Sequence, residues 1–467
     1  SPLTIIGIAI LNISEYGTDR DNRAKVSIAS HTFGSVDMLK ILSTSQIREA
    51  DSYTIRVQDI TSTELMERAG AACAKWIQER YQKERPVLAL AGPGNNGGDA
   101  LVIARLLRDH GFNVEVKVFQ SKNDFSPDFS INRERLLRMG VAVEQIETET
   151  DFPVITSETL VIDGLLGSGL SRPLDGLAAS LVEQVNASLA EVISIDIPSG
   201  LFADEPTPEG SAVILASHTL SFEVPKLVFM LPNALEQVGA WHIIKIGIDK
   251  NFISQCSSSY HAVDELFEFS EMFARHKFDH KGKFGHSLIF AGSLGKMGAA
   301  VLCARAAIRA GSALVSAHIP ACGTSIVQSS APEVMVRVDA AANYIGDVSD
   351  LKGISAIGVG PGIGTEKRTR KFVRMLCQNA SAPMVLDADA LNILALSGEM
   401  KKWLKNNSIL TPHIGEFERL FGKSENEFLR IKLLQKSAKE LGVFILLKGA
   451  HSALATPNGN VYFNTTG

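Results

Sequence analysis

The feature that most constrains this chain is a repeated alternation of short apolar runs, rich in β-branched residues, with amphipathic runs. Alternation of this kind favours a parallel sheet covered by helices on both faces. The first series predicts strands at residues 87–91, 114–119, 159–162, 191–195 and 241–246, with helices at 100–110, 131–139 and 178–187. We therefore predict an α/β fold with a Rossmann-like, doubly wound parallel sheet in the first half.

A second α/β series begins after a change of composition around residues 250–280. It predicts strands at residues 287–291, 313–318, 354–359, 384–386 and 443–447, with helices at 299–310 and 428–441. The loops that follow its strands differ from those of the first series, so the second unit is not a repeat. We predict domains at 38–255 and 265–467, preceded by a poorly determined extension at 1–37, with Met38 as a candidate start.

The composition of the chain limits the kinds of molecule that it can bind and the compartment in which it can work. The chain has 467 residues, enough for two domains, and its formal net charge of -5 disfavours nucleic acid and anionic membranes. The five cysteines show no CxxC spacing, which predicts free thiols in a reducing compartment. No apolar run has the length needed to span a bilayer. We expect a cytoplasmic homo-oligomer with no nucleic-acid or membrane partner.

A glycine-rich stretch, LAGPGNNGGDAL at residues 90–101, joins a predicted strand to a predicted helix. It lacks the lysine of a GxxxxGK[ST] loop, and its glycines do not fit GxGxxG. A helix N-terminus after such a loop favours an anionic or polar ligand. Asn96 offers an oxygen for a cation, and Asp99 adds charge. The alternative is a tight turn in which Asp99 serves only as the helix N-cap.

Two further predicted strands end on acids. Asp163 is followed by a glycine-rich stretch at 164–173, and Asp196 is followed by Ile-Pro-Ser-Gly at 197–200. Parallel sheets bind ligands at the carboxyl ends of their strands. Each acid alone is more often a cap than a catalyst. Three strand ends that converge on one edge favour a binding site.

The stretches GPGNNGGDALVIARLL, VIDGLLGSGLSRPLDG and ISIDIPSGL resemble the YjeF N-terminal domain, the NAD(P)H-hydrate epimerase family. The resemblance runs from about Leu42 to about residue 250. It implies binding of a potassium ion and interconversion of the R and S epimers of NAD(P)H hydrated at C6. Asp196 would contact the substrate as acid/base, and Asn96, Asp163 and Ser199 would donate oxygens to the ion. The implied substrate-binding residues are Asn95, Asn96, Gly97, Gly98 and Asp99, Gly167, Ser168, Gly169, Leu170, Ser171, Arg172 and Pro173, and Asp196.

The second half carries motifs at residues 281–286, 291–293, 358–364, 385–392, 410–417 and 447–452. Each alone is consistent with ordinary turns. In this order they resemble the ADP-dependent NAD(P)H-hydrate dehydratase, a ribokinase-like α/β fold, over about 265–467. The resemblance implies ADP, Mg²⁺ and phosphoryl transfer to the C6 hydroxyl of the S epimer. The implied hydrate-site residues are Ala299, Gly362 and His413, and the implied nucleotide-site residues are Lys448, Gly449, Ala450, His451 and Ser452.

The sequence ends at residue 467, where the dehydratase family continues into a Gly-[ST]-Gly-Asp loop. We therefore expect an incomplete, C-terminally truncated second domain that is inactive as given. The first half also departs from its family at one position, but less strongly: Asp99-Ala100 stands where the epimerase family often has Asp-Gly.

The leading hypothesis is a bifunctional repair enzyme whose ligands are NAD(P)H hydrate and ADP. The alternative is a ribokinase-like small-molecule kinase fused to a non-catalytic YjeF-type binding module. The pairing of TPHIGE and KGAHS with the GPGIG loop argues against the kinase. The intact Asn96, Asp163 and Asp196, with the acidic balance of the chain, argue against the binding module.

Overall fold

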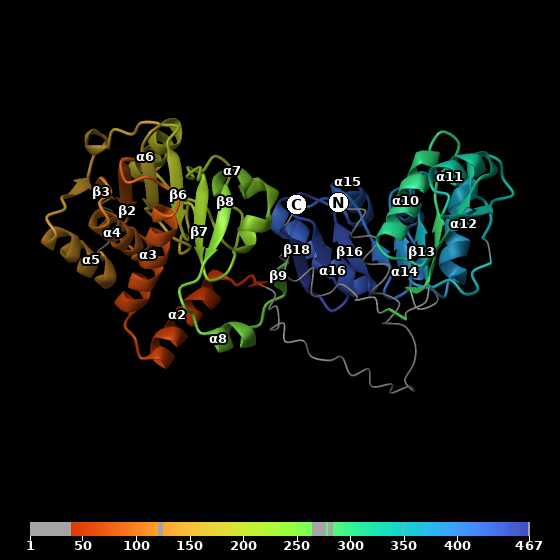
Figure 1. Ribbon diagram of the computed structural model, residues 1–467, viewed down its shortest axis with the longest axis horizontal. Coiled ribbons are helices and arrows are strands. Elements are labelled where there is room, and N and C mark those ends of the chain that lie inside the picture. The colour runs from red at the N-terminus through yellow and green to blue at the C-terminus, as the bar shows by residue number, and fades with distance from the viewer. Residues whose placement is uncertain (1–38, 120–124, 264–276, 279–283, 349, 466–467) are drawn as a thin grey trace. The chain divides into compact units, whose positions relative to one another are not determined.

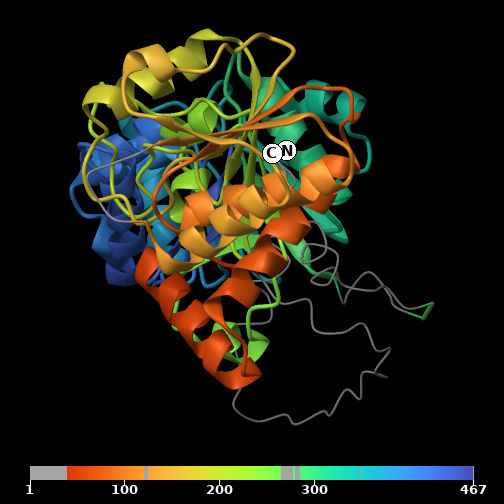
Figure 2. The ribbon, with the colours of Figure 1, turned by 90° about the vertical axis from the view of Figure 1, so that its left-hand side faces the viewer.

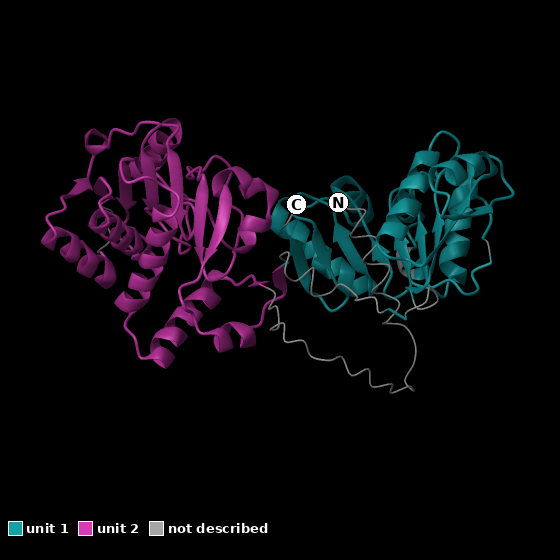
Figure 3. Ribbon diagram, in the orientation of Figure 1, with its two compact units in different colours: residues 1–38, 263–467 teal, residues 39–262 magenta. Residues whose placement is uncertain are grey.

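The computed structural model describes residues 39–119, 125–263, 277–278, 284–348 and 350–465. The predicted extension at 1–37 lies outside the described residues. The chain forms two compact units, one of residues Leu39–Ala262 and one whose described residues begin at Val263 (Figure 3). Among the described residues, no helix combines the length and apolar character that a membrane span requires. Each unit is an α/β structure built on its own parallel strands, which confirms the predicted fold class.

The first unit is built on a sheet in the order β4-β3-β2-β5-β6-β7-β8, in which every neighbouring pair is parallel. Successive strands are added outward from β2 in one direction and then from β5 in the other. The point between β2 and β5 is therefore a topological switch point, where such sheets bind ligands. The strands are β2 (Val87–Ala91), β3 (Val114–Phe119), β4 (Val143–Ile146), β5 (Leu160–Gly164), β6 (Glu191–Ile195), β7 (His218–Phe222) and β8 (Ala240–Ile244).

Helices cover both faces of this sheet. Figures 1 and 2 show α3, α4 and α5 on one face and α6 on the other. A short antiparallel pair joins β1 (Leu39–Lys40) to β9 (Tyr260–Val263). The helices are α2 (Thr44–Gln58), α3 (Ser62–Gln78), α4 (Asn95–Asp109), α5 (Pro127–Arg138), α6 (Gly176–Ala187), α7 (Leu235–Val238) and α8 (Lys250–Gln255), with 3₁₀ turns at Glu149–Asp151, Leu227–Met230 and Pro232–Ala234.

The core of the first unit follows from the period of the strands. All five residues of β2 are buried. Val87, Ala89 and Ala91 pack into the cluster that includes α3 and α4. Leu88 and Leu90 point to the opposite face and pack into the cluster that includes α6. Successive side chains of a strand alternate between faces, so a strand covered on both sides must be apolar throughout.

The second unit has strands in the order β18-β17-β16-β15-β14-β13-β10-β11-β12. Neighbours are parallel from β16 to β12, and β16, β17 and β18 are antiparallel. The strands are β10 (His286–Phe290), β11 (Leu314–Ile319), β12 (Met335–Val338), β13 (Ala356–Val359), β14 (Met384–Leu386), β15 (Ile409–Leu410), β16 (Phe444–Leu447), β17 (Ala453–Ala455) and β18 (Val461–Asn464). The helices are α10 (Met297–Arg309), α11 (Thr324–Ser330), α12 (Lys367–Asn379), α13 (Asp389–Ser397), α14 (Met400–Trp403), α15 (Ile414–Phe421) and α16 (Glu427–Leu441), with a 3₁₀ turn at Ala321–Gly323.

Candidate active site at the carboxyl edge of the first sheet

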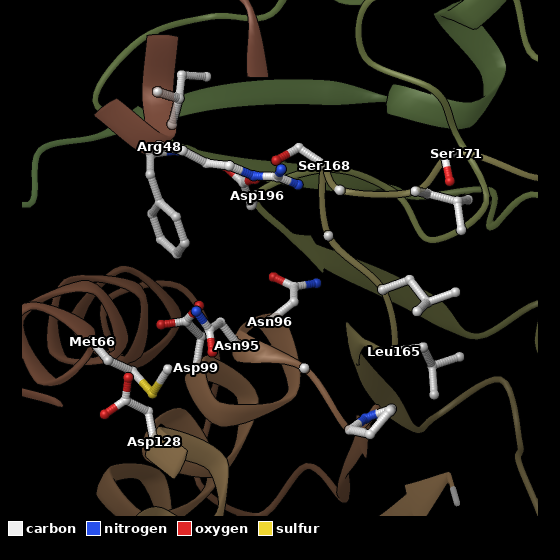
Figure 4. A pocket seen from close by; sticks show the side chains of 18 of the residues that line it. Arg48, Met66, Asn95, Asn96, Asp99, Asp128, Leu165, Ser168, Ser171 and Asp196 are labelled. Carbon is white, nitrogen blue, oxygen red and sulfur yellow. The ribbon is translucent and has the colours of Figure 1, made fainter. Parts of the chain in front are cut away.

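A cavity of about 1010 Å³ opens at the switch point of the first sheet. Its walls come from the segments that follow β2, β5 and β6, and from helices α2 and α3. Figure 4 shows Asn95, Asn96 and Asp99 on the first turn of α4, facing the same space as Ser168 and Asp196. Three segments far apart in the sequence therefore meet at one site, because the carboxyl ends of parallel strands share one edge.

The glycine-rich stretch after β2 is helical from Asn95, not from Ala100 as predicted. Gly94 is the N-cap and makes no side-chain capping bond, so the alternative in which Asp99 caps the helix is wrong. Asn95, Asn96 and Asp99 line the cavity. The carboxyl group of Asp99 is almost fully buried, and burial, followed by the nearby carboxylates, raises its pKa well above the ordinary value.

Gly97 and Gly98 hold this turn close to its neighbours, and neither lies on the cavity wall. A Cβ added to Gly97 would lie 1.8 Å from the carbonyl oxygen of Gly92, and one added to Gly98 would lie 2.7 Å from the sulfur of Met66. Both distances are far inside van der Waals contact. Gly97 and Gly98 are therefore packing residues in this structure, although the resemblance implies substrate binding.

The whole second segment, Gly167–Pro173, for which the resemblance implies substrate binding, lines the cavity. Arg172 brings one positive charge. Arg48 of α2 brings another, and its guanidinium lies close enough to Gly169 that an added Cβ would be 2.6 Å from Nη2. The motifs could not indicate Arg48, because it belongs to an ordinary amphipathic helix far from the glycine-rich stretches.

Asp163 connects the loop after β5 to the loop after β6 through its hydrogen bonds. It is fully buried and accepts four hydrogen bonds: from Ser194 Oγ at 2.7 Å, from Ser199 N and Oγ at 2.9 and 2.5 Å, and from Leu165 N at 3.3 Å. Burial raises the pKa of Asp163, against the lowering effect of these bonds. Ser199 Oγ also accepts a bond from Leu166 N at 2.8 Å. The Asp163–Ser199 pair therefore ties the loop after β6 to the loop after β5.

Asn96 adjoins the same segment from the other side. A Cβ on Gly164 would lie 2.9 Å from the backbone oxygen of Asn96, and one on Gly167 would lie 3.2 Å from the Asn96 Cβ. The buried Nδ2 of Asn96 has no hydrogen-bond partner in the part of the chain that the structure describes. The structure thus brings Asn96, Asp163 and Ser199 around residues 164–167. The four acceptor positions of the Asp163 carboxylate are already occupied.

Asp196 lies directly after β6 with φ of 65°, in the left-handed region. Its Oδ1 accepts a bond of 2.6 Å from Lys226 Nζ. The side chain of Lys226 is 1% exposed and also donates to Ser221 Oγ at 3.0 Å. Asp196 is therefore fixed by a buried cation, with its other oxygen available to the cavity that it lines. Lys226 lies in no recognised motif, and its role was not predicted.

Another carboxyl group, that of Asp51 on α2, also lines the cavity. Burial raises the pKa of Asp51 to about 6, the negative charge of Asp196 adds to the increase, and Lys226 opposes it. Asp51 was likewise not predicted, since it shares a helix pattern with many solvated acids.

In the second unit, the predicted residues also follow the carboxyl ends of strands. Gly362 follows β13 and lies against Ala299 of α10, so that an added Cβ would be 3.1 Å from Ala299 Cβ. His413 follows β15 and caps α15, its Nδ1 accepting bonds from two backbone N–H groups. Its backbone pairs with that of Lys448. The stretch from Lys448 to Ser452 connects β16 to β17.

Two charged side chains meet beside this stretch. Lys448 Nζ donates to Asp387 Oδ1 at 2.8 Å. Asp387 directly follows β14, so the ion pair joins the ends of β14 and β16. The structure therefore places a lysine, which can contact phosphate as a point charge, at the edge where the sequence predicts a nucleotide site.

Comparison with known proteins covers both units. The family model described as YjeF-related protein N-terminus matches residues 62–228, and the one described as NAD(P)H-hydrate dehydratase matches residues 287–467. A bifunctional NAD(P)H-hydrate repair enzyme of Thermofilum pendens is 32% identical over 442 residues, which cover 92% of this chain and 83% of the relative. The chain belongs to the family of bifunctional NAD(P)H-hydrate repair enzymes.

Other members of the repair-enzyme family match at similar levels. The Escherichia coli enzyme is 30% identical over 412 residues, covering 88% of this chain and 77% of the relative. The crystal structure of a Bacillus subtilis ADP/ATP-dependent NAD(P)H-hydrate dehydratase, co-crystallised with ATP and Mg²⁺, is 29% identical, with a TM-score of 0.37, and covers 42% of this chain and 68% of that chain. Family membership confirms the resemblance in both halves and disfavours the fusion of a kinase to a binding module.

Proposed function

We propose that this chain takes part in the repair of hydrated NAD(P)H. The first unit interconverts R- and S-NAD(P)H hydrate. The second unit is built for the ADP-dependent dehydration of S-NAD(P)H hydrate to NAD(P)H, a turnover that by the family resemblance also needs the Gly-[ST]-Gly-Asp loop. The observation that carries the first assignment is the position of Asp196, which faces a large cavity at the switch point while Lys226 holds one of its oxygens. A carboxylate so placed can exchange a proton with the C6 hydroxyl of a bound carbinolamine.

The walls of the cavity suit a dinucleotide. The volume of about 1010 Å³ lies at the upper end of the range for small-molecule pockets. Arg48 and Arg172 line it and can neutralise a pyrophosphate, for which arginine has a matching fork of donors. The N-terminal turn of α4 adds a partial positive charge. Asn95, Asn96 and Asp99 would then contact the polar atoms of the nicotinamide end.

Potassium is the cation that we propose for this half. Asn96, Asp163 and Ser199 surround one segment, and neutral oxygens with one carboxylate suit a hard cation. Asn96 would contribute its side-chain oxygen; the atom of that side chain without a hydrogen-bond partner among the described residues is Nδ2, which is a donor and cannot bind the ion. Asp163 would have to share an oxygen that already accepts two bonds. The ion would order the loops at the substrate; the proton transfer itself belongs to the carboxyl groups of the chain.

For the second unit we propose a site for ADP and Mg²⁺ formed by the stretch from Lys448 to Ser452, with the hydrate near Ala299, Gly362 and His413. Phosphoryl transfer depends on positioning and on neutralising charge. The Lys448 ammonium group can neutralise a phosphate, and a magnesium ion would supply the remaining positive charge.

We also propose a cytoplasmic homo-oligomer. The five free cysteines suit a reducing compartment, and the net charge of -5 opposes binding to nucleic acid. Light scattering on the purified chain tests the oligomeric state.

An incubation of the whole chain with R-enriched NADH hydrate tests the first activity. With potassium present and ADP absent, we expect the S epimer to appear faster than in a protein-free control, as followed by chromatography. Exchange of potassium for lithium should slow the reaction. Addition of ADP and Mg²⁺, with NADH followed by absorbance, measures the second activity separately. An epimer ratio that changes no faster than the control, with folded protein, contradicts the epimerase assignment.

Replacement of Lys448 tests the nucleotide site. We expect Lys448→Met to weaken binding of Mg²⁺–ADP by about tenfold or more, since a hydrogen bond to a charged group contributes about 1.5–3 kcal/mol. Isothermal titration calorimetry measures the affinity. Lys436→Met is the matched control, because Lys436 is an exposed lysine of α16. Equal affinities for the two variants would place the nucleotide elsewhere.

A further inference from the structure

We propose that Asp51 is a further catalytic residue of the first unit: the carboxyl group that protonates the departing C6 hydroxyl, while Asp196 accepts a proton from the water that returns. The inference rests on the proposed epimerisation. It assigns two different tasks to two carboxyl groups that line one cavity.

Contacts separate Asp51 from two of the four other acids that line the cavity, Asp128 and Asp196; of the remaining two, Asp175 is exposed and Asp99 is almost fully buried. Asp196 is paired with Lys226. Asp128, which also lines the cavity, accepts hydrogen bonds from Ser62 and Thr63. Asp51 receives no hydrogen bond from the described residues, and only burial and neighbouring charges act on it. A partly buried carboxyl group that lines a cavity and receives no hydrogen bond from the described residues can bond to a ligand.

The reaction needs more than one such group. The two epimers differ in the face of the ring that carries the hydroxyl group. A hydroxyl therefore leaves from one face and returns to the other, and a single carboxylate fixed by a lysine reaches one face best. Asp51 is carried by α2, whereas Asp196 follows β6, so the two groups enter the cavity from separate elements.

The step balances without any external oxidant or reductant. The Asp51 carboxyl proton passes to the C6 hydroxyl oxygen, the C6–O bond breaks with its electron pair on oxygen, and water leaves. The lone pair of the ring nitrogen forms a C=N bond. Water then adds to C6 from the other face, the C=N pair returns to nitrogen, and the extra proton passes to Asp196. Proton exchange between Asp196 and Asp51, through water or directly, restores the starting state.

Electrostatics fits this division of tasks. A group that must both give and regain a proton works best when its pKa lies near the working pH, and burial raises the pKa of Asp51 to about 6. The pKa of Asp99 is raised much further by its burial, so Asp99 suits a fixed donor of a hydrogen bond and not a group that exchanges protons. The charged groups that line the cavity with Asp51 are Arg48 on the same helix and Asp99, Asp128, Arg172, Asp175 and Asp196 from other segments, and Lys226 adjoins Asp196.

The test is Asp51→Asn in the full chain, with epimerisation measured in both directions from pH 5 to 9 and corrected for the uncatalysed rate. We expect kcat to fall about 100-fold with KM nearly unchanged. The wild-type kcat should decline as pH rises above the pKa of Asp51, since the proton is then lost, and this decline should be absent in the variant. Asp51→Glu should restore part of the rate. Glu49→Gln, an exposed acid on the same helix, is the control.

The outcomes separate this inference from the proposed function. A wild-type chain that does not epimerise the hydrate removes the proposed function itself. An active wild type with an equally active Asp51→Asn variant, or a variant that keeps the decline in kcat, overturns the role of Asp51 alone. A raised KM with unchanged kcat makes Asp51 a binding residue and also overturns it. Thermal melts of Asp51→Glu and Asp51→Asn show whether both remain folded.

Discussion

Replacement of Asp196 by asparagine is expected to lower kcat for epimerisation by about 10³-fold, a magnitude typical of the loss of a general acid or base. Asparagine keeps the size of the side chain and an oxygen that can accept a hydrogen bond from Lys226, but its amide group cannot act as a base. The buried lysine loses its counter-charge, so the free energy of unfolding should also fall, by about 3 kcal/mol. Both effects arise from the 2.6 Å contact between Asp196 Oδ1 and Lys226 Nζ.

A second variant separates the two effects. The double variant Asp196→Asn with Lys226→Met removes the unpaired cation and should recover much of the stability while remaining inactive. Asp109→Asn, which changes an exposed acid of α4, should match the wild type in rate and melting temperature. The chromatographic assay gives the rate, and denaturation followed by circular dichroism gives the stability. A single variant with wild-type activity would exclude Asp196 from the chemistry.

Gly97→Ala is expected to destabilise the first unit by about 3 kcal/mol or more, at the upper end of the usual range for overpacking. The new methyl group would lie 1.8 Å from the carbonyl oxygen of Gly92, which is backbone and cannot rotate away. Gly92 is itself held against Leu165, so the first turn of α4 would have to shift away from the loop after β2. Such a shift also displaces Asn96.

Gly94→Ala is the matched control. Gly94 is the N-cap of the same helix, with φ of -87°, and an added Cβ meets nothing within 4 Å. We expect a change below about 1 kcal/mol. Urea denaturation of both variants, with the slope compared to exclude a change in the unfolded state, measures the difference. Equal midpoints for the two variants would mean that the turn relaxes easily, against the packing described here.

The strands that the sequence predicts best are those buried on both faces. The bounds of β2, β6 and β14 agree with the predicted runs, because a continuous apolar stretch between turn residues has few other solutions. The bounds of β3 agree as well, but there the signal is the alternation of apolar and polar residues. Strand β7 was missed because His218, Thr219 and Ser221 make it look polar, although Thr219 and Ser221 are fully buried. Their hydroxyl groups donate to backbone carbonyls, which no sequence pattern reveals.

The predicted start of α4 was wrong for a related reason. Glycine and asparagine are poor helix formers, so the pattern predicts a helix only from Ala100. The structure begins the helix at Asn95 because the two glycines allow the first turn to pack against Gly92 and Met66. Close approach between backbones outweighs local propensity here.

The residues of the candidate site also fall into two groups, those that the sequence predicts and those that it does not. Residues within contiguous motifs, such as Asn96 and Asp196, could be proposed from the sequence. Lys226, Arg48 and Asp51 could not, because each lies in a segment with an ordinary pattern and reaches the cavity only through the fold. Predictions from motifs therefore recover the segments proposed to bind the ligand, and they miss the charged side chains that other segments bring to the same cavity.

The left-handed backbone at Asp196 has a consequence for how this protein can change over time. A residue other than glycine in that conformation costs about 1–2 kcal/mol, and Asp196 has φ of 65°. A glycine at this position would relax the backbone but leave the buried Lys226 without its counter-charge, at a cost of about 3 kcal/mol that exceeds the gain. Selection for heat resistance and selection for turnover therefore both retain the aspartate as long as Lys226 is present. Only a simultaneous replacement of Asp196 and Lys226 could raise stability at the expense of activity, so directed evolution toward stability should be screened for activity whenever Lys226 changes.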